Sequence, residues 1–209
     1  MFFLDHEIKF PPVDLADEYG VIAIGGDLSV DRLILAYKSG IFPWYNQGEP
    51  IVWYSPPKRM VLFPKELKIS KSMHQVIRNK DFKVTFNLNF TEVITKCMQI
   101  KRKGQEGTWI TNEMLIAYLE LHKMGIAKSV EVFYNNTLVG GLYGIDLGNI
   151  FCGESMFSQK NDASKVAFIY LVKKLEQESY SLIDCQVYND HLASLGAREI
   201  PRKEFTKML

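Results

Sequence analysis

The sequence predicts a mixed α/β protein with a small N-terminal domain and a larger C-terminal domain built on a mixed β-sheet. Three observations predict this class. A stretch dense in proline and aromatic residues, residues 41–60, interrupts regular structure early in the chain. Three consecutive strand patterns occupy residues 128–157. A long helical pattern and one more apolar strand follow directly, in residues 163–187.

The N-terminal residues have the pattern of a compact unit. Residues 21–26 form a short apolar run that ends in two glycines, which indicates a buried strand. Ser29 is placed to cap a helix that runs through Tyr37, and Gly40 ends that helix. We expect the domain boundary near Pro57, which gives domains at residues 1–57 and 58–209.

The C-terminal part begins with alternating helical and strand patterns. A helix is expected at residues 70–79, a strand at residues 82–86 and a second helix at residues 90–101. Thr111 then caps a helix that runs to His122 and stops at Gly125.

The next segment decides the fold of this part. Asn135 and Asn136 form the turn of a β-hairpin, and residues 150–157 add a third antiparallel strand. A helix at residues 163–177 leads to a strand at residues 181–187, which can pair in parallel with the preceding strand through a right-handed crossover. A meander, a helix and a parallel strand in this order are typical of the acyl-CoA N-acyltransferase fold. The comparison concerns the fold and leaves the substrate open.

The composition argues against several classes of protein. The chain has 209 residues, of which 47% are hydrophobic, enough to bury a core. It has no run of about 18 apolar residues, so we expect no membrane partner and a cytosolic location. The three cysteines form no CxxC pair and the four histidines are scattered, which argues against a disulfide framework and a metal site. The glycine clusters match no nucleotide-binding motif, so no cofactor is expected.

The positive charge is concentrated in one segment. Residues 51–104 contain twelve Lys and Arg and only three acidic residues, a net charge of +9 in a chain whose net charge is +1. Such a segment suits a surface that follows phosphates, although a lysine-rich solvated helix face explains it equally well. The basic residues considered as contacts to a nucleic-acid backbone are Lys58, Arg59, Lys65, Lys68, Lys71, Arg78, Lys80 and Lys83.

Aromatic side chains cluster in loop-like positions beside the basic segment. They are Trp44, Trp53, Tyr54 and Trp109. Unpaired bases stack on such residues, and one stacked base contributes roughly 1–3 kcal/mol. A loop tryptophan taken alone more often covers the edge of a core. The combination with the basic segment favours recognition of a nucleic acid.

Polar residues interrupt two apolar strands that we expect to be neighbours. Glu154 lies near the end of the third meander strand, and Asp184 and Gln186 lie near the end of the strand after the crossover helix. Strand alternation would place Asp184 and Gln186 on one face, so the three side chains can converge on a site. The alternative is a buried hydrogen-bond network that only holds the strands together. Cys152 and Cys185 lack a neighbouring histidine motif and are interpreted as packing residues.

The motifs as a set resemble the leucyl/phenylalanyl-tRNA–protein transferase family, whose bacterial members add leucine or phenylalanine to proteins that begin with arginine or lysine. The resemblance covers nearly the whole chain. The matching motifs are AIGGDLS at 23–29, GIFPW at 40–44, WYSP at 53–56, GTWI at 107–110, LVGGLYG at 138–144, FCGESMFS at 151–158, ASK at 163–165, LIDCQ at 182–186 and HLASLGA at 191–197, followed by IPR.

The resemblance implies a role for each matching position. It implies that the terminal adenosine of tRNA is held by Trp44 and Trp109, with Tyr37 and Tyr118 nearby. It implies an apolar pocket for the aminoacyl side chain, lined by Leu142, Phe151, Met156 and Ile183. Such a pocket separates apolar guests poorly, so methionine is expected as a minor donor.

The resemblance also implies a reaction without a cofactor or a covalent intermediate. The partners are leucyl- or phenylalanyl-tRNA and an acceptor protein with N-terminal Arg or Lys, which the transfer marks for degradation. Gln186, polarised by Asp184, accepts or orients the amine proton, Glu154 holds the cationic terminus, and Asn189 assists.

Two departures from the family pattern are Tyr54, where many relatives have tryptophan, and the short chain end after IPR.

Two other functions remain open at this point. The element order alone would also suit a coenzyme A-dependent N-acetyltransferase, although the residues before the crossover helix lack a pyrophosphate-binding glycine loop. The basic segment and the aromatic residues would suit an RNA-binding module without catalysis.

Overall fold

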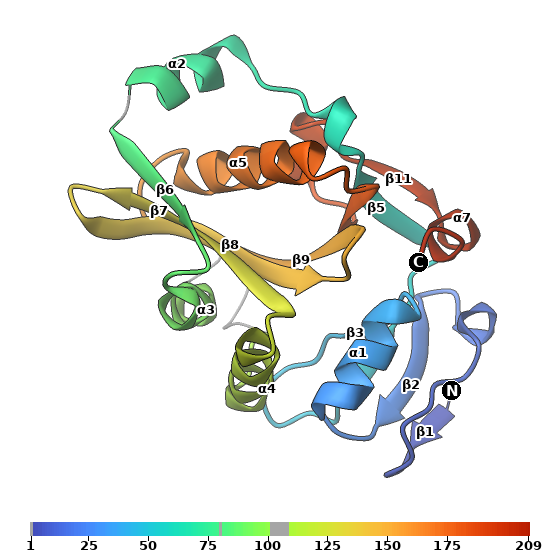
Figure 1. Ribbon diagram of the computed structural model, residues 1–209. Helices are drawn as coiled ribbons and strands as arrows, with labels where there is room; N and C mark the ends of the chain where they lie inside the picture. Colours follow the sequence, from blue (N-terminus) through green and yellow to red (C-terminus); the bar gives the residue numbers. More distant parts are fainter. Residues whose placement is uncertain (1, 80, 101–108) are drawn as a thin grey trace.

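The computed structural model describes residues 2–79, 81–100 and 109–209, and they form two β-sheets with helices packed against them (Figure 1). The N-terminal sheet has the order β1-β2-β4-β3. Its strands are β1 (Phe2–Leu4), β2 (Val21–Gly25), β3 (Phe42–Pro43) and β4 (Val52–Tyr54). Helix α1 (Val30–Lys38) joins β2 to β3 and begins after Ser29, as the sequence predicts, but the Ser29 side chain makes no capping hydrogen bond. The proline- and aromatic-rich stretch thus contains two short strands, β3 and β4, that sequence patterns did not reveal.

The C-terminal sheet has seven strands in the order β11-β5-β10-β9-β8-β7-β6. They are β5 (Lys58–Leu62), β6 (Phe82–Phe86), β7 (Ala127–Tyr134), β8 (Thr137–Asp146), β9 (Ile150–Ser158), β10 (Leu182–Gln186) and β11 (Arg198–Pro201). The meander of β7, β8 and β9 and the parallel pairing of β10 with β9 are confirmed. Strands β5 and β11 were not predicted, and β5 pairs antiparallel with β10 on its other side.

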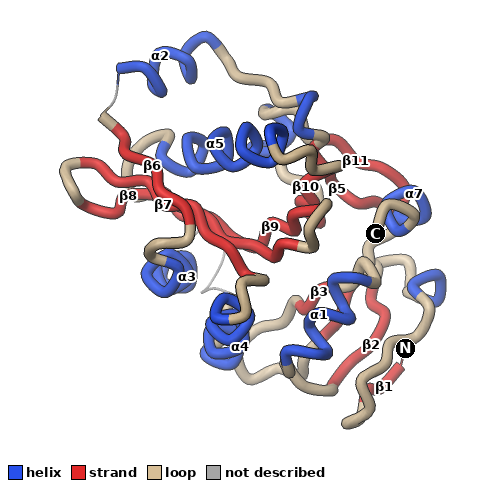
Figure 2. The backbone as a smooth tube through the Cα atoms, viewed as in Figure 1, coloured by secondary structure: helices blue, strands red, loops and turns tan. Residues whose placement is uncertain are grey.

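Helices cover both faces of the C-terminal sheet (Figures 1 and 2). Helix α5 (Ala163–Gln177) packs on one face, and its apolar side chains form a core with those of β5 and β10. Helices α3 (Phe90–Gln99) and α4 (Asn112–Lys123) lie on the opposite face, where their core is continuous with that of the N-terminal sheet. The predicted cap of α4 is present, because the Thr111 hydroxyl accepts the Met114 N–H at 3.2 Å.

The other α-helices of the described residues are α2 (Lys71–Asn79), α6 (Asp190–Ser194) and α7 (Arg202–Thr206), and two 3-10 helices lie at Val13–Leu15 and Pro64–Glu66. None of the helices in the described part of the chain is long and apolar enough to cross a membrane.

The pairing of β9 with β10 is short, and this positions the site. It joins only Leu182, Ile183 and Asp184 to the first three residues of β9. Strand β9 continues to Ser158 without β10 beside it, while the pairing of β10 with β5 is irregular between Asp184 and Gln186. The two strands therefore leave an opening in the sheet beyond Asp184.

Candidate active site

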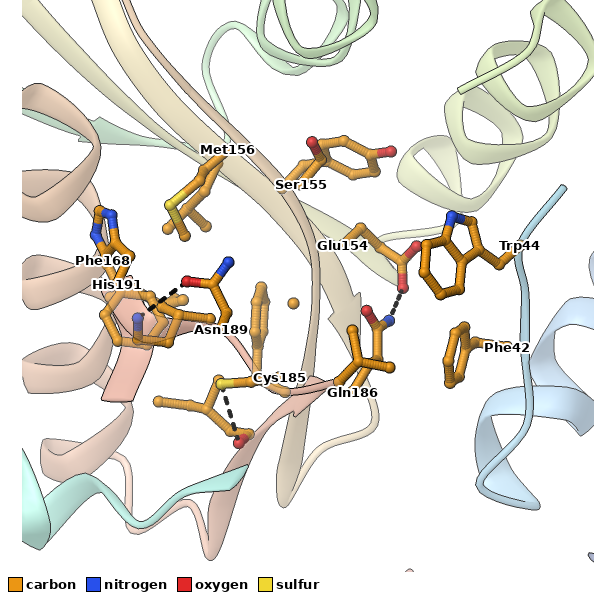
Figure 3. Close-up of a pocket in the computed structure, with 18 of the residues that line it drawn as sticks. Phe42, Trp44, Glu154, Ser155, Met156, Phe168, Cys185, Gln186, Asn189 and His191 are labelled. Carbon is orange, nitrogen blue, oxygen red and sulfur yellow. Dashed lines mark hydrogen bonds between the residues drawn. The ribbon is translucent and has the colours of Figure 1, made fainter. Parts of the chain in front are cut away.

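A cavity of about 470 Å³ lies where β9 and β10 part (Figure 3). Glu154 and Gln186 face each other in it, beside Phe42 and Trp44 of the segment that contains β3. Met156, Phe168 and His191 lie across the cavity from them. The cavity thus has one polar wall and a largely apolar remainder, the combination expected of a site for a small apolar group.

Glu154 is the centre of a chain of hydrogen bonds. The side-chain amide of Gln186 donates from Nε2 to Glu154 Oε1 at 2.8 Å. The hydroxyl of Tyr118 donates to Glu154 Oε2 at 3.0 Å, and it also hydrogen-bonds to the hydroxyl of Tyr37. Since Nε2 of Gln186 points to Glu154, the side-chain carbonyl oxygen of Gln186 can accept a hydrogen bond from another donor.

Burial raises the pKa of the Glu154 carboxyl to about 7, against the hydrogen bonds from Tyr37, Tyr118 and Gln186, which lower it. The negative charge of Asp184 adds to the increase. Burial also raises the pKa of Tyr37 and of Tyr118 well above the usual value, so both hydroxyls stay protonated. Glu154 can therefore gain or lose a proton near neutral pH, as a general base must.

Asp184 does not line the cavity. It is fully buried, and its two oxygens bind Arg59: Nε lies 2.7 Å from Oδ1 and Nη2 lies 2.7 Å from Oδ2. Its Oδ1 also accepts the backbone N–H of Gln186 at 2.9 Å. Asp184 was predicted to polarise the side chain of Gln186. The hydrogen bonds of its carboxylate run to Arg59 and to the backbone N–H of Gln186, not to the Gln186 side chain.

The backbone of Gln186 departs from regular strand geometry. Its φ is 64°, a left-handed conformation that few residues other than glycine adopt. The strand pairing shifts register at this point. Simple alternation, which predicted that Asp184 and Gln186 share a face, therefore fails across this bulge.

The four residues predicted for the aminoacyl pocket all line the cavity. They are Leu142 from β8, Phe151 and Met156 from β9, and Ile183 from β10. Sequence reasoning missed Phe168 and Leu171 from α5 and Phe42 from β3, which line it as well. The α5 residues were detectable only as members of an apolar helix face, which does not distinguish a cavity wall from core.

The four aromatic residues predicted to hold an adenosine divide into two pairs. Trp44, which is 41% exposed, and Trp109 both line the cavity. Tyr37 and Tyr118 are buried and have no exposed ring face for a base to stack on. We therefore reassign these two tyrosines to the support of Glu154. Trp53 is fully buried and donates to the Gly25 carbonyl oxygen at 2.9 Å, so it is a core residue.

The predicted phosphate contacts also divide. Lys58, Lys65, Lys68, Lys71, Arg78 and Lys83 are exposed, and Lys80 lies outside the described residues. Arg59 is only 2% exposed and binds Asp184, so its assignment to a phosphate is corrected: it is an internal ion-pair partner. A count of charge along the sequence does not separate an inward arginine from an outward one.

The remaining polar candidates have limited roles. Asn189 lines the cavity, and its side-chain oxygen caps α6 by accepting the Leu192 N–H at 3.2 Å.

Burial raises the pKa of the thiols of Cys152 and Cys185, which keeps them protonated. Burial lowers the pKa of His191, which is therefore neutral in the cavity wall. Within the described residues, no cluster of His, Cys, Asp and Glu is placed to hold a metal ion.

Two family models match this chain. The model described as leucyl/phenylalanyl-tRNA protein transferase matches residues 61–209, and the model of the N-terminal domain of the same transferase matches residues 26–57.

Curated relatives carry the same name. The leucyl/phenylalanyl-tRNA–protein transferase of Flavobacterium johnsoniae is 65% identical over 209 residues, with 100% of this chain and 99% of the relative covered. The transferase of Syntrophus aciditrophicus is 56% identical over 202 residues, covering 97% of this chain and 84% of the relative.

Among solved structures, FemX is similar with a TM-score of 0.50 and 10% sequence identity, over 86% of this chain and 70% of that chain. At that identity the likeness concerns the fold alone. It agrees with the acyl-CoA N-acyltransferase-like order of strands in the C-terminal sheet.

Proposed function

This chain belongs to the leucyl/phenylalanyl-tRNA–protein transferase family, and from that premise we propose how its cavity moves an aminoacyl group from tRNA to a protein. The donors are leucyl- and phenylalanyl-tRNA, with methionyl-tRNA as a minor donor. The acceptor is the N-terminal α-amine of a protein that begins with Arg or Lys, and the product is marked for degradation. The reaction takes place in the cytoplasm, where charged tRNA is present.

The lining of the cavity supports this assignment of the donor. Leucyl, phenylalanyl and methionyl side chains are apolar and differ in shape, and Leu142, Phe151, Met156 and Ile183 offer walls without a charged group. One of these walls is a methionine, whose flexible side chain adapts to different guests. Trp44 and Trp109 border the same cavity and supply ring faces for the terminal adenosine.

The outer surface supplies the remaining contacts to tRNA. The exposed basic residues of the segment from Lys58 to Lys83 contact backbone phosphates, an interaction that does not depend on sequence. The ester between the amino acid and the ribose is already activated, so orientation and one proton transfer are the main tasks left to the protein.

The observation that carries the proposed chemistry is the hydrogen bond between Gln186 and Glu154 at the polar wall. The carbonyl oxygen of Gln186 accepts an N–H of the attacking amine and aligns it with the ester carbonyl. Glu154, whose pKa lies at about 7, takes the proton as the C–N bond forms. The C–O bond to the ribose then breaks, and the proton passes to the ribose oxygen.

The test is the transfer of labelled leucine from leucyl-tRNA to a peptide that begins with arginine. We expect transfer to that peptide and to its lysine counterpart, and none to the same peptide with an acetylated terminus. Gln186→Ala should lower the rate about 100-fold, because loss of orientation has effects of that size. Gln177→Ala, which truncates an exposed glutamine at the end of α5, is the matched control.

Two outcomes would favour other functions. Binding of charged tRNA without transfer, unaffected by Gln186→Ala, would identify an RNA-binding module. A saturable increase in thermal stability with acetyl-CoA would favour a coenzyme A-dependent N-acetyltransferase.

A further inference from the structure

Arg59 lies at the meeting point of the two sheets. Its side chain extends from β5 and is buried, with both Asp184 oxygens at 2.7 Å on one side. Its Nη1 donates to the carbonyl oxygen of Gly40, just after α1, at 3.2 Å. One guanidinium thus joins β10 of the C-terminal sheet to the segment that enters β3 of the N-terminal sheet.

Two aromatic rings enclose the same guanidinium. Its central carbon lies 4.7 Å from the ring centroid of Phe42 and 4.7 Å from that of Phe205 in α7. Phe42 is itself a wall of the cavity and lies two residues before Trp44. Arginine suits this position because its planar guanidinium can stack on aromatic rings and donate two parallel hydrogen bonds to a carboxylate at the same time, which the ammonium group of lysine cannot do.

The link from Arg59 to the reacting groups runs through Asp184. Asp184 Oδ1 accepts the N–H of Gln186, whose backbone has the unusual φ of 64°. A residue other than glycine keeps such a conformation only where its surroundings fix it. The side chain of Gln186 then reaches Glu154 at 2.8 Å. The order of contacts is therefore Arg59, Asp184, Gln186 and Glu154.

We infer that Arg59 is a positioning residue for the transfer reaction. It fixes the backbone of Gln186 through Asp184, whose carboxylate it holds in place. The inference rests on the proposed function, since it assigns Arg59 to the orientation of the group that aligns the amine. It also assigns Asp184 a supporting role, because Asp184 links Arg59 to the backbone N–H of Gln186.

The kinetic test uses Arg59→Lys, which keeps the positive charge and loses the pair of hydrogen bonds to Asp184. We expect kcat for leucine transfer to fall about 100-fold, the effect of a misplaced reacting group, while the Kd for leucyl-tRNA changes by less than about 3-fold. In a Gln186→Ala background the same substitution should lower kcat by no more than about 3-fold, because both changes act on one group. A full 100-fold loss in both backgrounds would overturn the inference.

A matched control is available on β11. Arg198 also pairs with a carboxylate, Glu66, and stacks over Phe63 at 4.7 Å, but it is exposed and has no contact with Asp184 or Gln186. Arg198→Lys should leave kcat unchanged. If Arg59→Lys fails to fold, the double variant Arg59→Met with Asp184→Leu removes both buried charges together. It should keep the fold and show the same loss of kcat. Wild-type kcat in that variant would overturn the inference.

A second readout does not require activity. The backbone N–H of Gln186 donates to the Asp184 carboxylate, which Arg59 fixes. Hydrogen exchange of this N–H should therefore be at least about 10-fold faster in Arg59→Lys and unchanged in Arg198→Lys. Unchanged exchange at Gln186 in Arg59→Lys would refute the positioning role. If wild-type protein transfers no leucine but Gln186 exchange responds as expected, the proposed function fails while the structural link stands.

Discussion

Replacement of Glu154 by glutamine tests its proposed role as the base directly, because the change removes the ionisable group and keeps the size of the side chain. Burial raises the pKa of the Glu154 carboxyl from 4.5 to about 7. Each pKa unit corresponds to about 1.4 kcal/mol, so ionised Glu154 costs the folded protein up to about 3 kcal/mol at pH 8. We expect Glu154→Gln to be more stable than wild type by at most that amount, and to transfer leucine poorly.

The sign of the pH dependence follows from the direction of the shift. The folded protein binds the Glu154 proton more tightly than the unfolded chain does. The stability that this group contributes is therefore present in full below about pH 4.5, and it is lost as the pH rises to about 7. The difference in stability between Glu154→Gln and wild type should be below about 1 kcal/mol at pH 5 and reach its maximum above pH 7.

Activity should change in the opposite direction. With a pKa of about 7, the ionised fraction of Glu154 is about 10% at pH 6 and about 90% at pH 8. With both substrates saturating, kcat of wild type should rise about nine-fold between these values, and Glu154→Gln should lose this rise. Glu176→Gln, on α5 and away from the cavity, is the control.

The assays are single-turnover leucine transfer and urea unfolding, both measured from pH 5 to pH 8. Two results would refute the reasoning. One is a Glu154→Gln enzyme with the wild-type kcat and the same rise with pH. The other is a stability difference that does not change with pH, since the group would then not titrate in the folded protein.

Three further predictions concern substrate recognition. Trp44→Ala and Trp109→Ala should each raise the Kd for leucyl-tRNA about 5- to 150-fold, the effect of losing one stacked base, and should change kcat less. An unchanged Kd in a filter-binding assay would exclude the adenosine site. Met156→Ala enlarges the proposed aminoacyl pocket and should lower kcat/KM more for leucine than for phenylalanine, by about 5- to 100-fold in competition between the two charged tRNAs. An equal loss for both would contradict the assignment of Met156 to the pocket wall. Lys68→Glu should weaken tRNA binding and lower the slope of log Kd against log salt by about 1, whereas Lys123→Glu on α4 should leave the slope unchanged.

Regular elements with a clear period could be predicted from the sequence. The crossover helix α5 and the hairpin of β7 and β8 stand out because their apolar residues repeat at helical or strand spacing. Strands β5 and β11 could not be found in this way. They are five and four residues long. Strand β5 pairs with β10 and β11 pairs with β5, and this long-range pairing, not a local pattern, keeps both strands extended.

The candidate site was predictable in composition but not in connectivity. Glu154 and Gln186 were identified as polar interruptions of apolar strands, and they do face each other. The buried partner of Asp184 was missed, because Arg59 stands next to Lys58 in a basic segment and β5 was not recognised as a strand. The bulge at Gln186 has no local sequence signal either. A positive φ is usually predicted from a glycine or an asparagine, and this position has a glutamine.

The measurement that most directly tests the cavity as the site of transfer is single-turnover transfer of labelled leucine from leucyl-tRNA to an arginine-starting peptide, with tRNA binding measured in parallel. Wild type should bind and transfer. Gln186→Ala should bind charged tRNA with a Kd within about 3-fold of wild type and transfer about 100-fold more slowly. Equal transfer rates in the two proteins, at equal occupancy of leucyl-tRNA, would contradict the role given to the polar wall of the cavity.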